Sequence, residues 1–144
     1  MEVKKISKAK LPEAMALVWD VFLEFEAPDY SQEGIDEFKK FIDGQVAHMT
    51  RAIYGAYEKG QLLGVIATRN EGSHIALFFV RKDHHGQGIG RRLFEHILLL
   101  CESSFLTVNS SPYALKIYRK LGFVDMDTEQ LTNGIRYTPM SYSI

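Results

Sequence analysis

A glycine-rich loop is the segment of this 144-residue chain best suited to bind a charged ligand. It reads His85-Gly86-Gln87-Gly88-Ile89-Gly90 and lies between a predicted strand, 74–80, and a predicted amphipathic helix, 88–101. The first N–H groups of a helix are unpaired and carry partial positive charge, and glycine lets an anion come close to the backbone. The loop therefore predicts a phosphate or pyrophosphate site.

Two common nucleotide-binding motifs fit this loop poorly. A P-loop requires Lys and then Ser or Thr after its last glycine, whereas this chain has Arg91 and Arg92. The dinucleotide fingerprint requires its third glycine one residue later and a carboxylate at the end of the next strand, where this chain has Asn109. Both motifs are disfavoured.

Two further motifs lie downstream of the glycine-rich loop. Asn109 ends the predicted strand at 105–108, and Tyr118-Arg119-Lys120-Leu121-Gly122-Phe123 joins a helix to a following strand. With the loop, these motifs resemble those of the GNAT superfamily of acetyl-CoA-dependent N-acetyltransferases. The order of predicted elements is similar over nearly the whole chain. The loop departs from the family pattern at its first position, where His85 replaces Gln or Arg.

The resemblance implies an α/β (α+β) fold. It consists of a mixed, mostly antiparallel sheet of six to seven strands, about four helices and splayed central strands. Residues 1–144 would form a single acetyltransferase domain. Acetyl-CoA would lie in the gap between the strand at 74–80 and the strand at 105–109.

The resemblance also implies roles for individual residues. The pantetheine amides would pair with the first strand, the pyrophosphate would lie on the loop, and Asn109 would bond the amide chain. The Tyr118 hydroxyl would act as the general acid that protonates the departing thiolate. The implied cofactor-binding residues are Phe78, Phe79, Val80, His85, Gly86, Gln87, Gly88, Ile89, Gly90, Arg91 and Asn109.

The general base stays open at this stage. Many relatives carry a carboxylate on the strand before the loop, but residues 75–80 contain none. The candidates are a bound water and the side chains of His74, Glu24, Glu26 and Asp29. No nucleophile is apparent, which favours direct attack of an amine on acetyl-CoA in a ternary complex. The alternative is an acyl-CoA-binding sensor on the same fold with little or no turnover.

Charge is unevenly distributed along the chain. Residues 20–43 carry a net charge of −6, and residues 81–92 carry +3. This polarity predicts a cationic amine acceptor, either a small molecule or a peptide, at one mouth and the anionic cofactor at the other. The overall net charge of −1 indicates no nucleic-acid partner.

Composition and sequence pattern indicate which covalent links, metal sites and membrane segments the chain lacks. The single cysteine, Cys101, excludes an internal disulfide and a cysteine-rich metal site. His84 and His85 have no third ligand nearby, so we expect no metal. No apolar run approaches the ~20 residues of a membrane helix, and the N-terminus lacks a signal-like stretch. We therefore expect a cytoplasmic protein without membrane contact, as a monomer or homodimer.

Periodicity and turn residues place the elements. Ser31 and Ser111-Pro112 are predicted to begin helices, Pro28 and Gly122 to end them, and Asn133-Gly134 to turn a hairpin between the last two strands. The predicted strands are 3–6, 52–57, 62–67, 74–80, 105–108, 123–126 and 135–142, and the predicted helices begin near residues 11, 31, 88 and 111.

Overall fold

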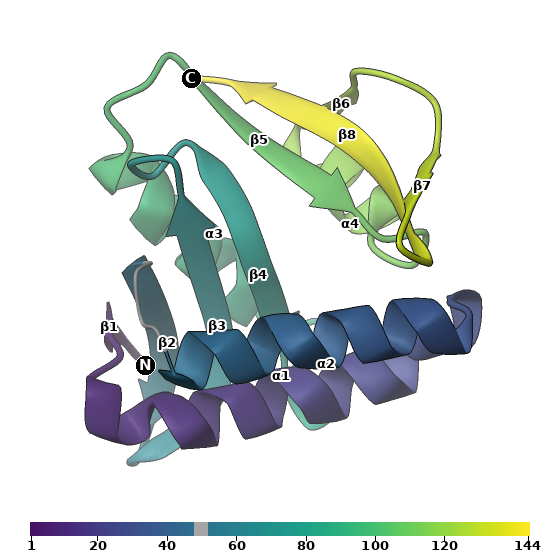
Figure 1. Ribbon diagram of the computed structural model, residues 1–144. Coiled ribbons are helices and arrows are strands. Elements are labelled where there is room, and N and C mark those ends of the chain that lie inside the picture. Colours follow the sequence, from purple (N-terminus) through teal and green to yellow (C-terminus); the bar gives the residue numbers. More distant parts are fainter. Residues whose placement is uncertain (48–51) are drawn as a thin grey trace.

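The computed structural model describes residues 1–47 and 52–144, which form one mixed sheet with helices on both faces (Figure 1). The strand order is β1-β2-β3-β4-β5-β8-β6, and β7 pairs with β8 off this path. Every pairing is antiparallel except that between β4 and β5. The strands are β1 (Glu2–Lys5), β2 (Ala52–Glu58), β3 (Gln61–Arg69), β4 (His74–Val80), β5 (Phe105–Ser110), β6 (Val124–Asp125), β7 (Gln130–Thr132) and β8 (Ile135–Ser143).

Four α-helices cover the sheet. The pair α1 and α2 packs on one face, and α3 and α4 pack on the other (Figure 1). Short 3-10 turns precede α1, follow it, and precede the glycine-rich loop. The helices are α1 (Leu11–Phe25), α2 (Gln32–Ala47), α3 (Ile89–Leu100) and α4 (Leu115–Leu121), and the turns are η1 (Lys8–Lys10), η2 (Ala27–Asp29) and η3 (Lys82–His84).

Strand β4 contributes to both apolar cores. Leu77 and Phe79 belong to the core beneath α1 and α2, whereas Phe78 and Val80 pack against the core beneath α3 and α4. Successive side chains of a strand point to opposite faces, so a strand with a helix layer on each side must be apolar throughout. The sequence prediction of a strand buried on both faces is confirmed.

The central strands separate after a short parallel contact. β4 and β5 pair only at His74 with Thr107 and at Ile75 with Val108. Beyond that point β4 continues to Val80 while β5 pairs with β8 alone. The sheet therefore has two arms, and within residues 1–47 and 52–144 no strand pairs with the second half of β4 on the side that faces β5. The expected splay is confirmed.

The structure differs from the predicted elements in two places. The sheet has eight strands rather than six or seven, because β7 pairs with β8 across the Asn133-Gly134 turn. The sequence predicts 123–126 as the neighbouring strand of that hairpin. Helix α4 begins at Leu115 and not at Pro112. The Ser111 side chain still accepts a hydrogen bond from the Ala114 backbone N–H (3.2 Å), but it closes a turn before the helix.

Candidate active site

A cavity of about 560 Å³ lies in the gap between the two arms. One wall is β4, and the facing wall comes from the end of β5 and from α4. Helix α2 and the β7–β8 turn supply the remainder. The residues that line the cavity are Glu26, Tyr30, Glu37, Phe38, Lys40, Phe41, Ile75, Ala76, Leu77, Phe78, Phe79, Val108, Asn109, Ser111, Ala114, Tyr118, Thr132, Asn133, Ile135 and Tyr137.

A second cavity of about 390 Å³ lies between the glycine-rich loop and α4. It shares Phe78, Ala114 and Tyr118 with the first cavity, so the two meet at these side chains. The arrangement is a long cleft with the glycine-rich loop at one end and α2 at the other. The remaining lining residues are Val80, His85, Gly86, Gly88, Ile89, Gly90, Tyr113 and Ile117.

Most of the expected cofactor residues border this cleft. Seven of them line the cavity at the loop: Phe78, Val80, His85, Gly86, Gly88, Ile89 and Gly90. Phe79 and Asn109 line the larger cavity. Gln87 and Arg91 line neither. Both belong to the same loop-to-helix segment, and both are exposed.

The loop has the backbone geometry that an anion site requires. Gly86 and Gly88 have φ angles of 78° and 81°, in the left-handed region, and an added Cβ at either would meet no atom within 4 Å. Gly88 is the N-cap of α3, so the first N–H groups of that helix open onto the loop. Open space beside an exposed helix N-terminus fits a pyrophosphate.

The basic residues near the loop are largely engaged within the protein. The Arg81 Nε donates to the Leu62 carbonyl (2.7 Å), and Lys82 forms an ion pair with Glu24 (2.9 Å). Arg92 donates to the Met1 carbonyl (3.3 Å). Arg91 has no such contact in the part of the chain that the structure describes. The positive charge predicted for this loop is therefore partly neutralised, at Lys82 by Glu24.

His85 turns back onto the protein. Its Nε2 lies 2.7 Å from the Val80 carbonyl, at the end of β4. Its ring lies 5.0 Å from that of Phe25, which in turn lies 5.0 Å from the ring of Tyr113. Three rings from α1, the loop and the β5–α4 turn thus come together beside the smaller cavity. His85, which stands where the family pattern has Gln or Arg, thus contacts the end of β4.

Tyr118 lies where the two cavities meet and is only 6% exposed. Its ring packs against Phe78 (6.0 Å between centroids) and Phe123 (5.3 Å). Burial raises the pKa of its hydroxyl well above the ordinary range, and the negative charge of Glu26 raises it further. The hydroxyl therefore stays protonated and can donate a hydrogen bond into the cleft.

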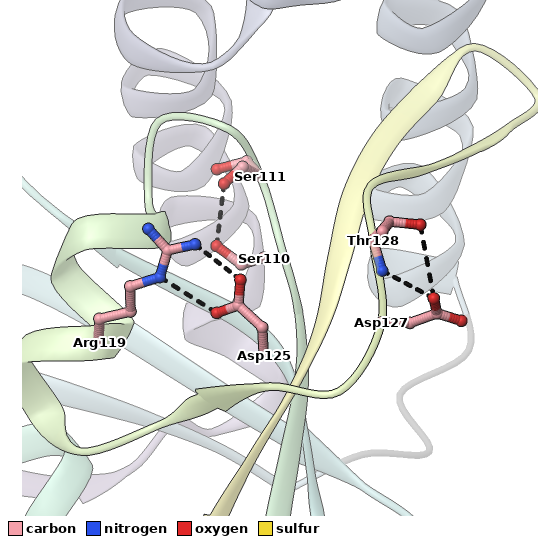
Figure 2. A network of polar contacts seen from close by, with 6 residues as sticks. All are labelled: Ser110, Ser111, Arg119, Asp125, Asp127 and Thr128. Atoms are coloured by element: carbon pink, nitrogen blue, oxygen red, sulfur yellow. Dashed lines mark hydrogen bonds and ion pairs between the residues drawn. The ribbon is translucent and has the colours of Figure 1, made fainter.

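Polar contacts outside the cleft hold Tyr118 and Ser111 in place. Arg119 on α4 donates two hydrogen bonds to the Asp125 carboxylate (3.1 and 2.7 Å), which ties α4 to β6 (Figure 2). The Ser110 hydroxyl donates to the Ser111 carbonyl (2.9 Å) and shapes the turn after β5 (Figure 2). Gly122 ends α4 with a φ of 114°, as its place in the sequence predicted.

Glu26 is the candidate base that the structure brings into the cleft. It follows α1 directly and lines the larger cavity. Burial raises the pKa of its carboxyl to about 7, an effect that the Ser111 hydroxyl partly opposes and Asp29 slightly increases. A carboxylate with a pKa near 7 can accept a proton at neutral pH and later release it.

The other three base candidates lie elsewhere. His74 is 9% exposed, lines neither cavity, and has its Nδ1 2.7 Å from the Thr107 hydroxyl. Burial, reinforced by the Arg69 charge, lowers the pKa of His74 to about 4. Glu24 is exposed and paired with Lys82, and Asp29 is exposed and lines neither cavity. Of the acidic residues in the segment 20–43, Glu26 and Glu37 line the larger cavity, while Glu24 and Asp29 lie outside it.

Several residues of the larger cavity were not singled out from the sequence. Tyr30, Glu37 and Lys40 lie within the segment 20–43 that was expected near the acceptor, whereas Asn133 and Tyr137 come from the β7–β8 hairpin. The Tyr30 hydroxyl donates to the Arg136 carbonyl (3.2 Å), which joins the two segments. The Asn133-Gly134 turn was a clear signal in the sequence, but nothing in the sequence shows that it packs against α2.

Within residues 1–47 and 52–144, no three His, Cys, Asp or Glu side chains gather as they would around a metal ion. Across the same residues, no helix has the length and hydropathy needed to cross a membrane.

The family model described as "Acetyltransferase (GNAT) domain" matches residues 26–144, which include the cleft and all of its predicted cofactor residues. The chain belongs to the GNAT acetyltransferase family. This confirms the family and the acyltransferase class that the three sequence motifs indicated.

Individual relatives of this GNAT chain agree with the assignment. A peptidyl-lysine N-acetyltransferase, YjaB of Salmonella typhimurium LT2, is 40% identical over 53 residues, which are 36% of this chain and 37% of that protein. The match thus spans little more than a third of the curated relative. The structure also matches that of apo YjaB from Escherichia coli, with a TM-score of 0.77, 19% identity, and coverage of 98% and 96% of the two chains.

Two further solved structures share the fold. A GCN5-related N-acetyltransferase from Rhodopseudomonas palustris has a TM-score of 0.81 and 17% identity, covering 99% of this chain and 95% of its own. PaiA N-acetyltransferase from Thermoplasma acidophilum, in complex with coenzyme A, has a TM-score of 0.74 and 17% identity, covering 99% and 98%. The mixed α/β fold with splayed strands is therefore that of the GNAT family.

Proposed function

We propose that the protein transfers an acetyl group from acetyl-CoA to a primary amine by direct attack in a ternary complex, with residues 1–144 acting as one acetyltransferase domain. The observation that carries the proposal is the junction of the two cavities at Phe78, Ala114 and Tyr118. One cavity opens on an anion-binding loop, and the other contains a carboxylate with a pKa near 7. A thioester and an amine that enter from opposite ends would meet at Tyr118.

The chain fits acetyl-CoA at both of its recognition features. The backbone of Gly86–Gly90 and the N-terminus of α3 would bind the pyrophosphate. The unpaired side of β4, from Phe78 to Val80, would pair with the pantetheine amides, and Asn109 faces them across the gap. Bound there, acetyl-CoA supplies an activated acyl thioester.

Glu26 and Tyr118 have complementary roles in this account. Glu26 accepts the proton that the amine loses as its nitrogen bonds to the acyl carbon. Tyr118 donates a hydrogen bond to the sulfur as the carbon–sulfur bond breaks. The ordinary pKa of a thiol is about 8.5, below that of tyrosine, so the hydrogen bond stabilises the departing thiolate without a completed proton transfer. Burial keeps the Tyr118 hydroxyl protonated for this purpose.

Direct attack is favoured because Cys101, the only cysteine, lines neither cavity. The proposal defines the acceptor by its chemical class, a primary amine. The lysine substrate in the name of the YjaB relative is one primary amine of the proposed class. A small-molecule amine is another.

The experiment is release of CoA thiol from acetyl-CoA across a panel of primary amines, with each product identified by mass spectrometry. We expect release that depends on the amine and initial rates whose double-reciprocal lines intersect. Tight binding of acetyl-CoA without thiol release for any amine would support the sensor alternative. An acetylated protein formed in the absence of amine would contradict direct attack.

A further inference from the structure

Helix α2 carries two kinds of charged side chain. On its outer surface, neighbouring groups pair with each other: Gln32 donates to Asp36 (2.8 Å) and Lys39 to Asp43 (2.8 Å). Glu37 and Lys40 instead line the larger cavity. They are three residues apart on the helix, close enough to pair, yet in the part of the chain that the structure describes no ion pair joins them. Both charges are available to a ligand.

The β7–β8 turn lies beside Glu37. The Asn133 amide donates to the Glu37 carboxylate (3.5 Å). The backbone of the turn rests directly on α2, because a Cβ at Gly34 would overlap the Gly134 carbonyl. A larger residue at either glycine would push the turn away. The Glu37 carboxylate thus lies at one wall of the cavity, beside the turn.

Glu37 and Lys40 on α2 lie at a different end of the cavity from Glu26. The negative charge of Glu26 raises the pKa values of Tyr118 and Tyr30, whereas Glu37 perturbs neither. Glu26 interacts with Ser111 on the β5 side, and Glu37 with Asn133 on the β7–β8 side. The cavity therefore has a proton-accepting end at Glu26 and a separate end that carries one negative and one positive charge.

We propose that the acceptor is a free α-amino acid whose side chain ends in a primary amine, with Glu37 binding its α-ammonium and Lys40 its α-carboxylate. This inference rests on the proposed function. The side-chain nitrogen bonds to the acyl carbon as the carbon–sulfur bond breaks. The neutral amine gives up one proton to Glu26 as the new bond forms. The thiolate leaves hydrogen-bonded to Tyr118 and takes up a proton from water, so the products are the side-chain N-acetyl amino acid and CoA thiol.

Charge complementarity separates this acceptor from two others. A lysine within a peptide has neither α-charge, so Glu37 and Lys40 would each lose water without gaining a partner. A simple diamine has a second ammonium for Glu37, but Lys40 would repel it. Only the free amino acid matches both charges.

The test compares three acceptors that share one distal amine: L-lysine, cadaverine, and Nα-acetyl-L-lysine N-methylamide. We expect kcat/KM for L-lysine to exceed that of the other two by about ten-fold or more, the value of one charged hydrogen bond. Glu37→Gln and Lys40→Met should each lower kcat/KM for L-lysine by about ten-fold. Neither variant should lower kcat/KM for the peptide analogue, and Lys40→Met should not lower it for cadaverine.

Asp36→Asn and Lys39→Met are matched controls on the outer surface of the same helix, and we expect them to leave all three acceptors unchanged. Preference for the peptide analogue would overturn the inference, as would equal losses for all three acceptors in the Glu37 and Lys40 variants. Calorimetric binding of L-lysine in the presence of CoA gives a readout without turnover. If no amine releases thiol, the proposed function fails, whereas thiol release with the wrong preference contradicts only the acceptor class.

Discussion

Glu26 and Tyr118 line one cavity from elements far apart in the chain, and the charge on Glu26 raises the pKa of Tyr118. The carboxyl is itself held near a pKa of about 7 by burial. A carboxyl whose pKa is close to neutral pH thus lies in the electrostatic range of a hydroxyl that stays protonated at neutral pH. This division between a proton acceptor and a hydrogen-bond donor underlies the mechanism proposed above.

Replacement of Tyr118 by Phe tests the donor. The variant keeps the ring that packs against Phe78 and Phe123 but removes the hydroxyl. We expect kcat to fall by roughly 10²–10³, as when one hydrogen-bond donor to a developing negative charge is removed, with the Kd for acetyl-CoA nearly unchanged. Initial rates and calorimetry on the same preparation measure both. Unchanged kcat would show that Tyr118 is only a core aromatic residue.

The glycine-rich loop is tested by a matched pair of substitutions. Gly88 and Gly60 have similar left-handed φ angles (81° and 79°) and open space around the missing Cβ. Gly88→Glu places a carboxylate beside the N-terminus of α3, whereas Gly60→Glu places one in the distant β2–β3 turn. We expect similar losses of stability from backbone strain in both. Only Gly88→Glu should weaken acetyl-CoA binding, by about ten-fold or more, because like charges repel.

If calorimetry gives the two glutamate variants the same affinity for acetyl-CoA, the loop is not the pyrophosphate site. Thermal unfolding of both proteins provides the control for strain.

The sequence predicted the cofactor half of the cleft better than the acceptor half. Gly86 and Gly88 belong to a loop whose glycines mark it in the sequence, and Tyr118 was selected through the resemblance to the GNAT motif; all three line the cleft. Glu37 and Asn133 contribute to the site only because the β7–β8 turn rests on α2. That contact joins segments about 100 residues apart in the chain, and periodicity carries no information about it.

Glu26 illustrates the same limit within a short segment. Glu24, Glu26 and Asp29 are equivalent acids in the sequence, and choosing among them requires knowing where α1 ends and what faces it. Helix α1 ends at Phe25, and Ser111 from the distant β5–α4 turn lies against the next residue. Glu24 lies on the exposed side of the helix, where Lys82 pairs with it.

His74 predicts a dependence of stability on pH. In the folded state its pKa is about 4, against 6.5 for a solvent-exposed histidine in the unfolded chain. Between pH 6.5 and pH 4, His74 therefore binds a proton in the unfolded chain but not in the folded protein. The free energy of unfolding should fall between pH 6.5 and pH 4, by about 1–2 kcal/mol, since solvent reduces the full effect of the shift.

Urea unfolding of the parent and of His74→Asn at pH 7, 5.5 and 4.5 measures this contribution. Asparagine can still donate to the Thr107 hydroxyl, which itself donates to the Ser73 carbonyl (3.3 Å), but it does not titrate. The loss of stability on acidification should be smaller in the variant. Equal losses in the two proteins would show that His74 takes up its proton normally in the folded state.

The pH–rate profile of the parent beside that of Glu26→Gln tests the central claim most directly, because it asks whether the buried carboxyl takes the proton of the amine. For the parent, we expect kcat/KM for the amine to rise with pH through an apparent pKa of about 7. In Glu26→Gln, the rate should be lower by roughly 10²–10⁴ and the step near pH 7 should be absent. A profile in which the variant keeps that step, or reacts as fast as the parent at every pH, would contradict the account.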